Sequence, residues 1–260
     1  MNELKGLMVN RWLRRGGVLV VGGGAVWVTL VLSGCASVDS QQGSSAPHPH
    51  EQHLHAQAWQ GWHVHLLPGK RPTHYKLDQH EGRSVVLATS ERAVSLFRKN
   101  ERIEPEQLGA LHFSWKVPQL ISGADLAQRD KADSPARLVL AFEGDRSTFS
   151  MKNSMLSELS QALTGEPMPY ATLMYVWSNR HPVESVIANP RTERIQKIVV
   201  ESGPTQLKRW LEYERDVLAD FQKAFGEAPG ALLAIGLMTD SDNTQSTTRA
   251  WYGDIRLSRP

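Results

Sequence analysis

The chain is poor in the residue patterns that most often carry recognisable chemistry. Only one cysteine, Cys35, occurs among its 260 residues, which excludes a structural disulfide and weakens any case for a thiol catalyst or a cysteine-based metal site. The sequence also has no Gly-Xaa-Ser-Xaa-Gly elbow, no P-loop and no His-Glu-Xaa-Xaa-His motif. The usual motifs of serine hydrolases, nucleotide-dependent enzymes and zinc proteases are therefore missing.

A long apolar run is missing as well. Residues 18–32 form an uncharged apolar segment of 15 residues that includes three consecutive glycines, whereas a transmembrane helix needs about 20 apolar residues. Four basic side chains precede it, namely Lys5, Arg11, Arg14 and Arg15. A basic start followed by a short apolar core is the layout of a secretory signal peptide.

The segment that follows resembles the lipobox of bacterial lipoproteins. It reads Leu32, Ser33, Gly34 and Cys35, an aliphatic residue and two small ones before the cysteine. We therefore expect a signal peptide at residues 1–34, cleavage before Cys35 and attachment of lipid to its thiol. Acyl chains contribute about 0.8 kcal/mol per buried CH₂, so two or three of them hold a protein on a membrane permanently. Alanine at the next position favours the outer membrane.

The charge of the chain belongs largely to this leader. Residues 1–34 carry four of the 29 basic side chains and one of the 27 acidic ones, and the formal net charge of the whole chain is only +2. The remainder is close to neutral and has no basic stripe, so nucleic acid is not an expected partner.

Residues 35–58 are expected to form a disordered tether, because they are polar and almost free of large apolar side chains. The tether contains His48, His50, His53 and His55. These imidazoles are either plain tether composition or a weak, unselective site for Zn, Cu or Ni. Residues 59–260 are long enough for a single domain with a sizeable core.

Alternating apolar and polar residues predict a β-rich domain. The clearest case is Leu111, Phe113, Trp115 and Val117, which are separated by polar residues. Further strands are expected at residues 62–67, 74–77, 84–89, 137–142, 173–177, 195–200, 232–238 and 249–257. Turn-forming residues separate them, and no steady alternation of strand and helix suggests a parallel sheet. We predict an all-β, antiparallel, jelly-roll-like β-sandwich.

One or two short helices are expected to decorate the sandwich. Met151, Met155, Leu159 and Leu163 recur at every fourth position, with Asn153 or Ser154 as the expected cap. A second helix is predicted from Val217, Phe221 and Phe225, which repeat the spacing before Gly226 ends it.

Several segments resemble the bacterial envelope proteins grouped as domain-of-unknown-function family 3047. They span most of residues 60–258 in order and include Phe113-Ser114-Trp115-Lys116-Val117, Leu173-Met174-Tyr175-Val176-Trp177, Asp240-Ser241-Asp242-Asn243-Thr244 and Ala250-Trp251-Tyr252-Gly253-Asp254. The resemblance implies a secreted or lipid-anchored β-rich domain. It implies no particular activity.

The acidic segment after a predicted strand is the first candidate site. Asp240, Asp242 and Asn243 place three oxygen-bearing side chains within four residues, and Ca²⁺ prefers such ligands. The offsets of an EF-hand loop are absent. The alternatives are that these side chains only tighten the loop through bonds to its backbone, or that they contact a substrate.

Asp133 and Arg137 give a second candidate, with two interpretations. They form an ion pair that fixes their loop, or Asp133 pairs with Asp240 or Asp242 as the two carboxylates of a glycan-directed hydrolase. Glycosidases hold such carboxylates about 5 Å apart when retaining and about 6.5–9.5 Å apart when inverting, a spacing that the sequence does not reveal.

Aromatic residues offer a third line of argument. Trp177 lies in a predicted strand, and exposed aromatic rings bind the apolar faces of sugars. The alternative is that Trp115 and Trp177 are core residues, as large aromatics in strands often are, while Trp251 and Tyr252 point to opposite faces.

These observations predict a non-catalytic, lipid-anchored envelope domain that binds a glycan or another envelope component. Its expected binding residues are Trp177, Asp240, Asp242 and Asn243, with calcium as the candidate cation. The alternatives are the glycan-directed hydrolase and a purely structural envelope protein whose acidic loop only shapes the fold.

Overall fold

The computed structural model describes residues 59–258. These residues belong to one compact unit, and all the strands and both apolar clusters described below lie within them. The predicted signal peptide at residues 1–34, the lipidation of Cys35 and the tether at residues 35–58 lie outside the described residues and stay predictions.

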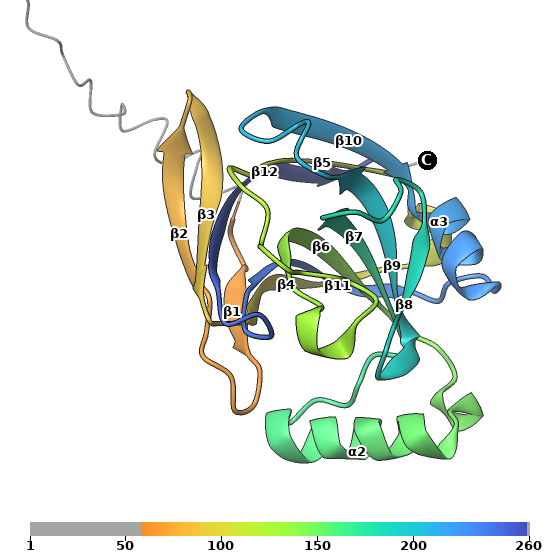
Figure 1. Cartoon of the computed structure of the whole chain (residues 1–260). Helices are drawn as coiled ribbons and strands as arrows, with labels where there is room; N and C mark the ends of the chain where they lie inside the picture. The colour runs from red at the N-terminus through yellow and green to blue at the C-terminus, as the bar shows by residue number, and fades with distance from the viewer. Residues whose placement is uncertain (1–58, 259–260) are drawn as a thin grey trace, which may run out of the picture. The chain divides into compact units, whose positions relative to one another are not determined.

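The domain is a sandwich of two β-sheets (Figure 1). The larger sheet has seven strands, in the spatial order β1 (His63–Leu66), β4 (Ser95–Ile103), β11 (Leu232–Asp240), β6 (Ser134–Phe142), β7 (Ala171–Ser178), β9 (Thr192–Ser202) and β8 (Val186–Asn189). The smaller sheet has five, in the order β10 (Trp210–Asp216), β5 (Ala110–Lys116), β12 (Thr247–Leu257), β3 (Arg83–Glu91) and β2 (His74–His80). The predicted β-sandwich is confirmed.

One pair of strands departs from the predicted antiparallel arrangement. Strands β7 and β9 run parallel, with Tyr175 opposite Ile198. The reason is the tight turn at residues 189–192, which pairs β9 antiparallel with β8. Because β9 lies between β8 and β7, β8 becomes the edge strand and β9 runs in the direction of β7.

The space between the sheets is filled by large side chains. Trp115 and Tyr252 from the five-stranded sheet meet Phe142, Tyr175 and Trp177 from the seven-stranded sheet, and all five are at most 1 % exposed. Aromatic contacts join the layers, as between Phe113 and Tyr175, whose ring centroids are 5.7 Å apart. This inner core is closely packed, as expected for a domain whose stability comes from burial of apolar area.

Within residues 59–258, two α-helices lie on the sandwich (Figure 1). Helix α3 (Val217–Phe225) begins at its cap Asp216, ends at Gly226, and buries Phe221 against Phe142, so this predicted helix is confirmed. Helix α2 (Met151–Thr164) is also present, but its cap is Ser150 rather than Asn153 or Ser154. Three short 3₁₀ turns occur at Pro105–Gln107, Arg129–Lys131 and Arg146–Thr148.

Helix α2 buries few of its apolar side chains. Four apolar side chains of the helix remain exposed, Met151 by 82 % and Met155 by 64 %, and Leu159 and Leu163 as well. The buried side chains of the helix are the polar Asn153 and Ser157. Across residues 59–258, no helix is both long and apolar enough to cross a membrane.

Candidate functional site

The fold brings the predicted acidic residues together from two distant parts of the chain. Asp240 ends β11, Asp242 lies in the loop that follows, and Asp133 immediately precedes β6. One carboxylate oxygen from each of the three lies within 4.8 Å of the others. Strands β6 and β11 are neighbours in the sheet, which explains the meeting of residues more than a hundred positions apart.

Asp133 is fully engaged by the loop that it faces. Its Oδ1 accepts hydrogen bonds from the backbone N–H and the side-chain amide of Asn243, at 3.2 and 2.8 Å. Its Oδ2 accepts from the backbone N–H and the hydroxyl of Thr244, at 2.7 and 2.6 Å. This buried carboxylate therefore holds the loop after β11 against the start of β6.

Basic side chains hold the other two carboxylates. Arg137 donates to both oxygens of Asp240, from Nε at 3.0 Å and from Nη2 at 2.8 Å, and both side chains are buried. Lys70 pairs with Asp242. Burial raises the pKa of Asp240 to about 7, while the positive charge of Arg137 acts in the opposite direction.

This arrangement matches the structural interpretations of the acidic segment. The carboxylates accept hydrogen bonds that fix a loop and an ion pair, and N–H donors compete with a cation for the same oxygen lone pairs. Neither Asp133 nor Asp240 offers a free carboxylate for glycosidase chemistry. A calcium ion at Asp240, Asp242 and Asn243 stays a prediction.

Trp177 does not lie on a binding surface, which corrects the prediction that it contacts a ligand. Its side chain is completely buried in the inner core, and its Nε1–H donates to the carbonyl oxygen of Gly203 at 3.1 Å. Along β7, Tyr175 and Trp177 point into the sandwich, while Met174 and Val176 point to the outer face. The alternation therefore places Trp177 in the core, the other interpretation of the sequence.

A second apolar surface covers the outer face of the seven-stranded sheet. Its buried members are Val94, Leu126, Val139, Met174, Val176, Ile187, Val199 and Met238. The loop at residues 117–133 lies over part of this face and contributes Leu126. The loop is tied down by Asp125, which accepts hydrogen bonds from Gln128 at 2.6 Å and His181 at 2.8 Å, and by an ion pair with Arg180.

Helix α2 covers another part of the same face and is held mainly at its two ends. Near its start, the amide of Asn153 donates to Glu193 at 2.5 Å and accepts from the hydroxyl of Thr192 at 2.7 Å. After its end, Glu166 pairs with Arg98 at 2.5 Å. The helix is thus fixed to the sheet by polar contacts rather than by its apolar residues.

An apolar cavity of about 490 Å³ lies between α2 and the sheet. Its floor includes Leu96, Val139, Ala141, Met174, Ile195, Ala234 and Met238, and its roof includes Leu156, Leu159, Leu163 and Met168. A few polar side chains, such as His65, Arg98 and Glu166, stand among them. The space is partly open to solvent, and its size and mostly apolar lining are those of a ligand site.

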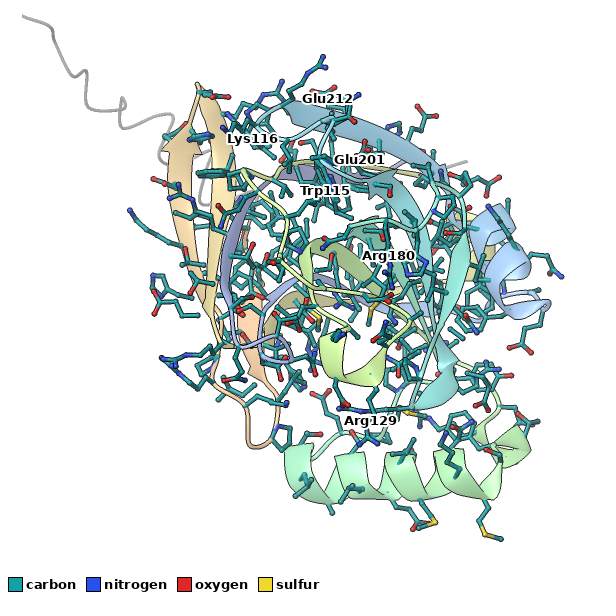
Figure 2. All side chains as sticks on the ribbon, viewed as in Figure 1. Trp115, Lys116, Arg129, Arg180, Glu201 and Glu212 are labelled. Carbon is teal, nitrogen blue, oxygen red and sulfur yellow. The ribbon has the colours of Figure 1, made fainter. Side chains whose placement is uncertain are left out.

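A polar groove of about 630 Å³ lies on the opposite side of the sandwich, on the outer face of the five-stranded sheet. Figure 2 places Glu212 on this side and Arg129 on the side that faces α2. The groove is lined by His112 and Ser114 from β5, Glu212 and Glu214 from β10, and Arg256 from β12. Trp251 also points outward here, but His80 stacks on it at 4.2 Å and leaves only 8 % of it exposed.

Sequence reasoning missed the cavity and the groove. The cavity residues carry one available signal, since every residue of β7 is buried and the strand reads as a continuous apolar run rather than an alternating one. Such runs indicate strands covered on both faces. The groove residues gave no such signal. Charged and apolar residues alternate in β10, as they do in any strand with one face in solvent.

A family model described as "Protein of unknown function (DUF3047)" matches residues 60–256, which confirms the resemblance predicted from the sequence. No curated protein matches this chain.

Solved structures with a similar arrangement include a thermostable cellulase derived from the Cel12A cellulase of Rhodothermus marinus. It is 12 % identical with a TM-score of 0.39, over 76 % of this chain and 96 % of that one. Another is the xyloglucanase domain of NopAA, a type three effector from Sinorhizobium fredii, in complex with cellobiose. It is 10 % identical with a TM-score of 0.38, over 76 % and 93 % of the two chains. At these values the likeness bears on neither the activity nor the ligand of this chain.

Proposed function

The chain belongs to the DUF3047 family, and we propose that its domain is a non-catalytic module that binds an acyl chain of a bacterial envelope component. The observation that carries the proposal is the apolar cavity of about 490 Å³ between α2 and the seven-stranded sheet. Ligand sites for small molecules have volumes of about 300–1,000 Å³ and mostly apolar walls with a few polar groups. The cavity has each of these properties.

The construction of the roof supports a ligand rather than a packing defect. Leu156, Leu159 and Leu163 of α2 already line the space without filling it. The helix is pinned through Asn153 and followed by the Glu166–Arg98 pair, which keeps it away from the sheet. An acyl chain would fill the space and contribute about 0.8 kcal/mol per buried CH₂.

The proposed cellular setting is the bacterial envelope, most specifically the outer membrane, with the chain anchored through a lipid on Cys35. The support is the order of a basic segment, an apolar segment and Leu32-Ser33-Gly34-Cys35 in the sequence. Metabolic labelling with an alkyne fatty acid tests the anchor. Label on the wild-type chain and none on the Cys35→Ser variant is expected, and equal labelling of both would refute it.

Binding can be tested with a soluble chain of residues 47–260, which contains the complete core. We expect titration calorimetry with lauroylglycerol, below its aggregation concentration, to show saturable binding. Ala141→Trp places an indole on the cavity floor and is expected to abolish that binding. Ala162→Trp, on the exposed surface of α2, is the matched control and is expected to bind as the wild type does.

Circular dichroism checks that both variants remain folded. Absence of binding to the wild-type chain contradicts the proposal. Equal binding by Ala141→Trp and the wild type also contradicts it, because the ligand would then lie elsewhere.

A second candidate function is glycan binding in the groove of the five-stranded sheet. The specific observation is that His112, Ser114, Glu212, Glu214 and Arg256 line one open space with groups that bond sugar hydroxyls. Titration against a panel of envelope oligosaccharides tests it. A Glu212→Gln/Glu214→Gln variant is expected to lose any glycan that the wild type binds, and unchanged binding would exclude this groove.

A further inference from the structure

A smaller cavity of about 200 Å³ adjoins the acyl cavity on the same face of the sheet. The two share Leu67, Met174 and Met238 in their walls. Their linings differ in character, because the smaller one is surrounded by ionic side chains from β6, β9 and β11, the loop at residues 117–133 and the turn before β9. A ligand that extends through both would have an apolar part and a charged part.

The charges around the smaller cavity are unbalanced. Five basic side chains line it, namely Lys70, Arg129, Arg137, Arg191 and Lys197, against the two carboxylates of Asp240 and Asp242. The carboxylates are already paired, Asp240 with Arg137 and Asp242 with Lys70. Three cations therefore remain for a ligand.

Two of these cations are free guanidinium groups. Arg129 comes from the 3₁₀ turn Arg129–Lys131, and Arg191 from the turn between β8 and β9; both are exposed. Within residues 59–258, neither guanidinium takes part in a hydrogen bond or an ion pair. Guanidinium groups bind phosphate and carboxylate oxygens through paired N–H donors.

The third cation is at the base of the cavity and is unusual in its burial. Lys197 is 0 % exposed, and its Nζ makes one hydrogen bond, to the carbonyl oxygen of Leu126 at 2.9 Å. An ammonium group has three N–H donors, so two of them have no hydrogen-bond partner among the described residues. Burial lowers the pKa of Lys197 to about 7, with Arg137 acting in the same direction and Asp240 and Asp125 in the other. An anion in the cavity would favour the charged amine.

We infer that the ligand of this domain is an anionic amphiphile, whose phosphate or carboxylate headgroup lies among Arg129, Arg191 and Lys197 and whose acyl chain lies under α2. This inference rests on the proposed acyl-chain function and specifies the class of its ligand. The unpaired cations select the headgroup by charge, and the shared residues Leu67, Met174 and Met238 place the two cavities directly beside each other.

The test compares two probes that differ only in the phosphate. Lauroylglycerol phosphate and lauroylglycerol are titrated into the chain of residues 47–260 at low ionic strength, with inorganic phosphate and laurate as further arms. We expect the phosphate-bearing lipid to bind at least about tenfold more tightly than the neutral one. Laurate is expected to share part of this advantage, and inorganic phosphate alone is expected to bind far more weakly than either anionic lipid.

The matched variants separate the headgroup from the chain. Arg129→Gln/Arg191→Gln removes two cations that hold no structural contact and is expected to weaken binding of the phosphate-bearing lipid about tenfold, with no change for lauroylglycerol. Arg209→Gln, before β10 and outside both cavities, is the control for loss of a positive charge. Raised salt is expected to reduce the preference in the wild type.

Each outcome decides one of the two proposals. Equal affinity for the two lauroyl lipids overturns the headgroup inference and leaves the acyl-chain function standing. Equal loss of both lipids in the double arginine variant also overturns it. Inorganic phosphate that binds as tightly as the lipid identifies a free-anion site and refutes the amphiphile. Absence of binding by every lipid contradicts the proposed function itself.

Discussion

The two faces of the seven-stranded sheet are both apolar but are covered in different ways. The inner face meets the five-stranded sheet through Phe142, Tyr175 and Trp177, which are completely buried. The outer face carries Val139, Met174 and other aliphatic residues under a loop and a helix, and leaves a cavity of about 490 Å³. On the inner face, the opposite sheet fills the space above the apolar strand residues, and these residues stabilise the fold. On the outer face, the loop and the helix leave space above them, and some of these residues are available to a ligand.

The residue types on the two faces fit this division. Aromatic rings such as Phe113 and Tyr175 stack at fixed distances and specify one packing. Methionines such as Met174 and Met238 are unbranched and adapt to irregular surroundings. The outer face thus has the composition of a surface that adjusts to a flexible partner.

The largest expected effect comes from removing a ring of the inner face. Trp177→Ala is expected to lower the free energy of unfolding by about 3–5 kcal/mol, because it leaves a large cavity in a closely packed core. Met174→Ala, on the outer face of the same strand, is expected to cost about 1–2 kcal/mol, because its side chain already borders an open space. Urea denaturation of both variants measures their free energies of unfolding. Similar losses of stability in the two variants would contradict the proposed difference between the faces.

A smaller effect is expected from the ion pair at the edge of the outer face. Arg137→Met leaves the buried carboxylate of Asp240 without its partner and is expected to cost about 3 kcal/mol. The double variant Arg137→Met/Asp240→Leu is expected to regain most of that loss, since neither member of the pair is left buried without its ionic partner. Thermal unfolding of the single and double variants gives the comparison. A double variant as unstable as the single one would contradict a purely structural role for the pair.

The smallest effect concerns the loop that covers the outer face, and it depends on pH. Burial acts to raise the pKa of Asp125, but hydrogen bonds from His181, the N–H of Ala127, Gln128 and Arg180 outweigh it and lower the pKa to about 2. Since the folded-state pKa is below the unfolded value, the stabilisation is present above about pH 4 and is lost as the pH falls toward 2.

Asp125→Asn is therefore expected to be about 2 kcal/mol less stable than the wild type at pH 7, with the gap closing near pH 2. Urea denaturation at a series of pH values follows it. Asp130→Asn, an exposed carboxylate on the same loop, is the control. A gap that stays constant with pH would mean that Asp125 acts through packing alone.

The sequence predicted the elements whose pattern is local. Strand β5 follows from the alternation of Phe113 and Trp115 with polar residues, and α3 follows from its spacing and Gly226. Strand β4 was missed, because Arg98, Lys99, Asn100, Glu101 and Arg102 interrupt any apolar alternation. Its place in the sheet comes from pairing with β11, which no local pattern contains.

The candidate site was predictable only in part, for a related reason. The sequence singled out Asp133, Asp240 and Asn243, but their contact depends on β6 and β11 being neighbours. The spacing of Met151 and Met155 predicted α2 but not the direction of its apolar stripe. The direction of that stripe is decided by the bonds of Asn153 to Glu193 and Thr192, forty residues away in the chain.

The placement of the methionines has a consequence for oxidation chemistry. Met151 and Met155 on the outer side of α2 are 82 % and 64 % exposed, whereas Met174 and Met238 in the cavity walls are each 7 % exposed. Peroxide converts accessible thioethers to sulfoxides, so the first pair reacts as an internal standard and the second pair reports on access to the cavity. The rate of sulfoxide formation at Met174 and Met238, relative to the rate at Met151 and Met155, therefore measures how accessible the space under α2 is.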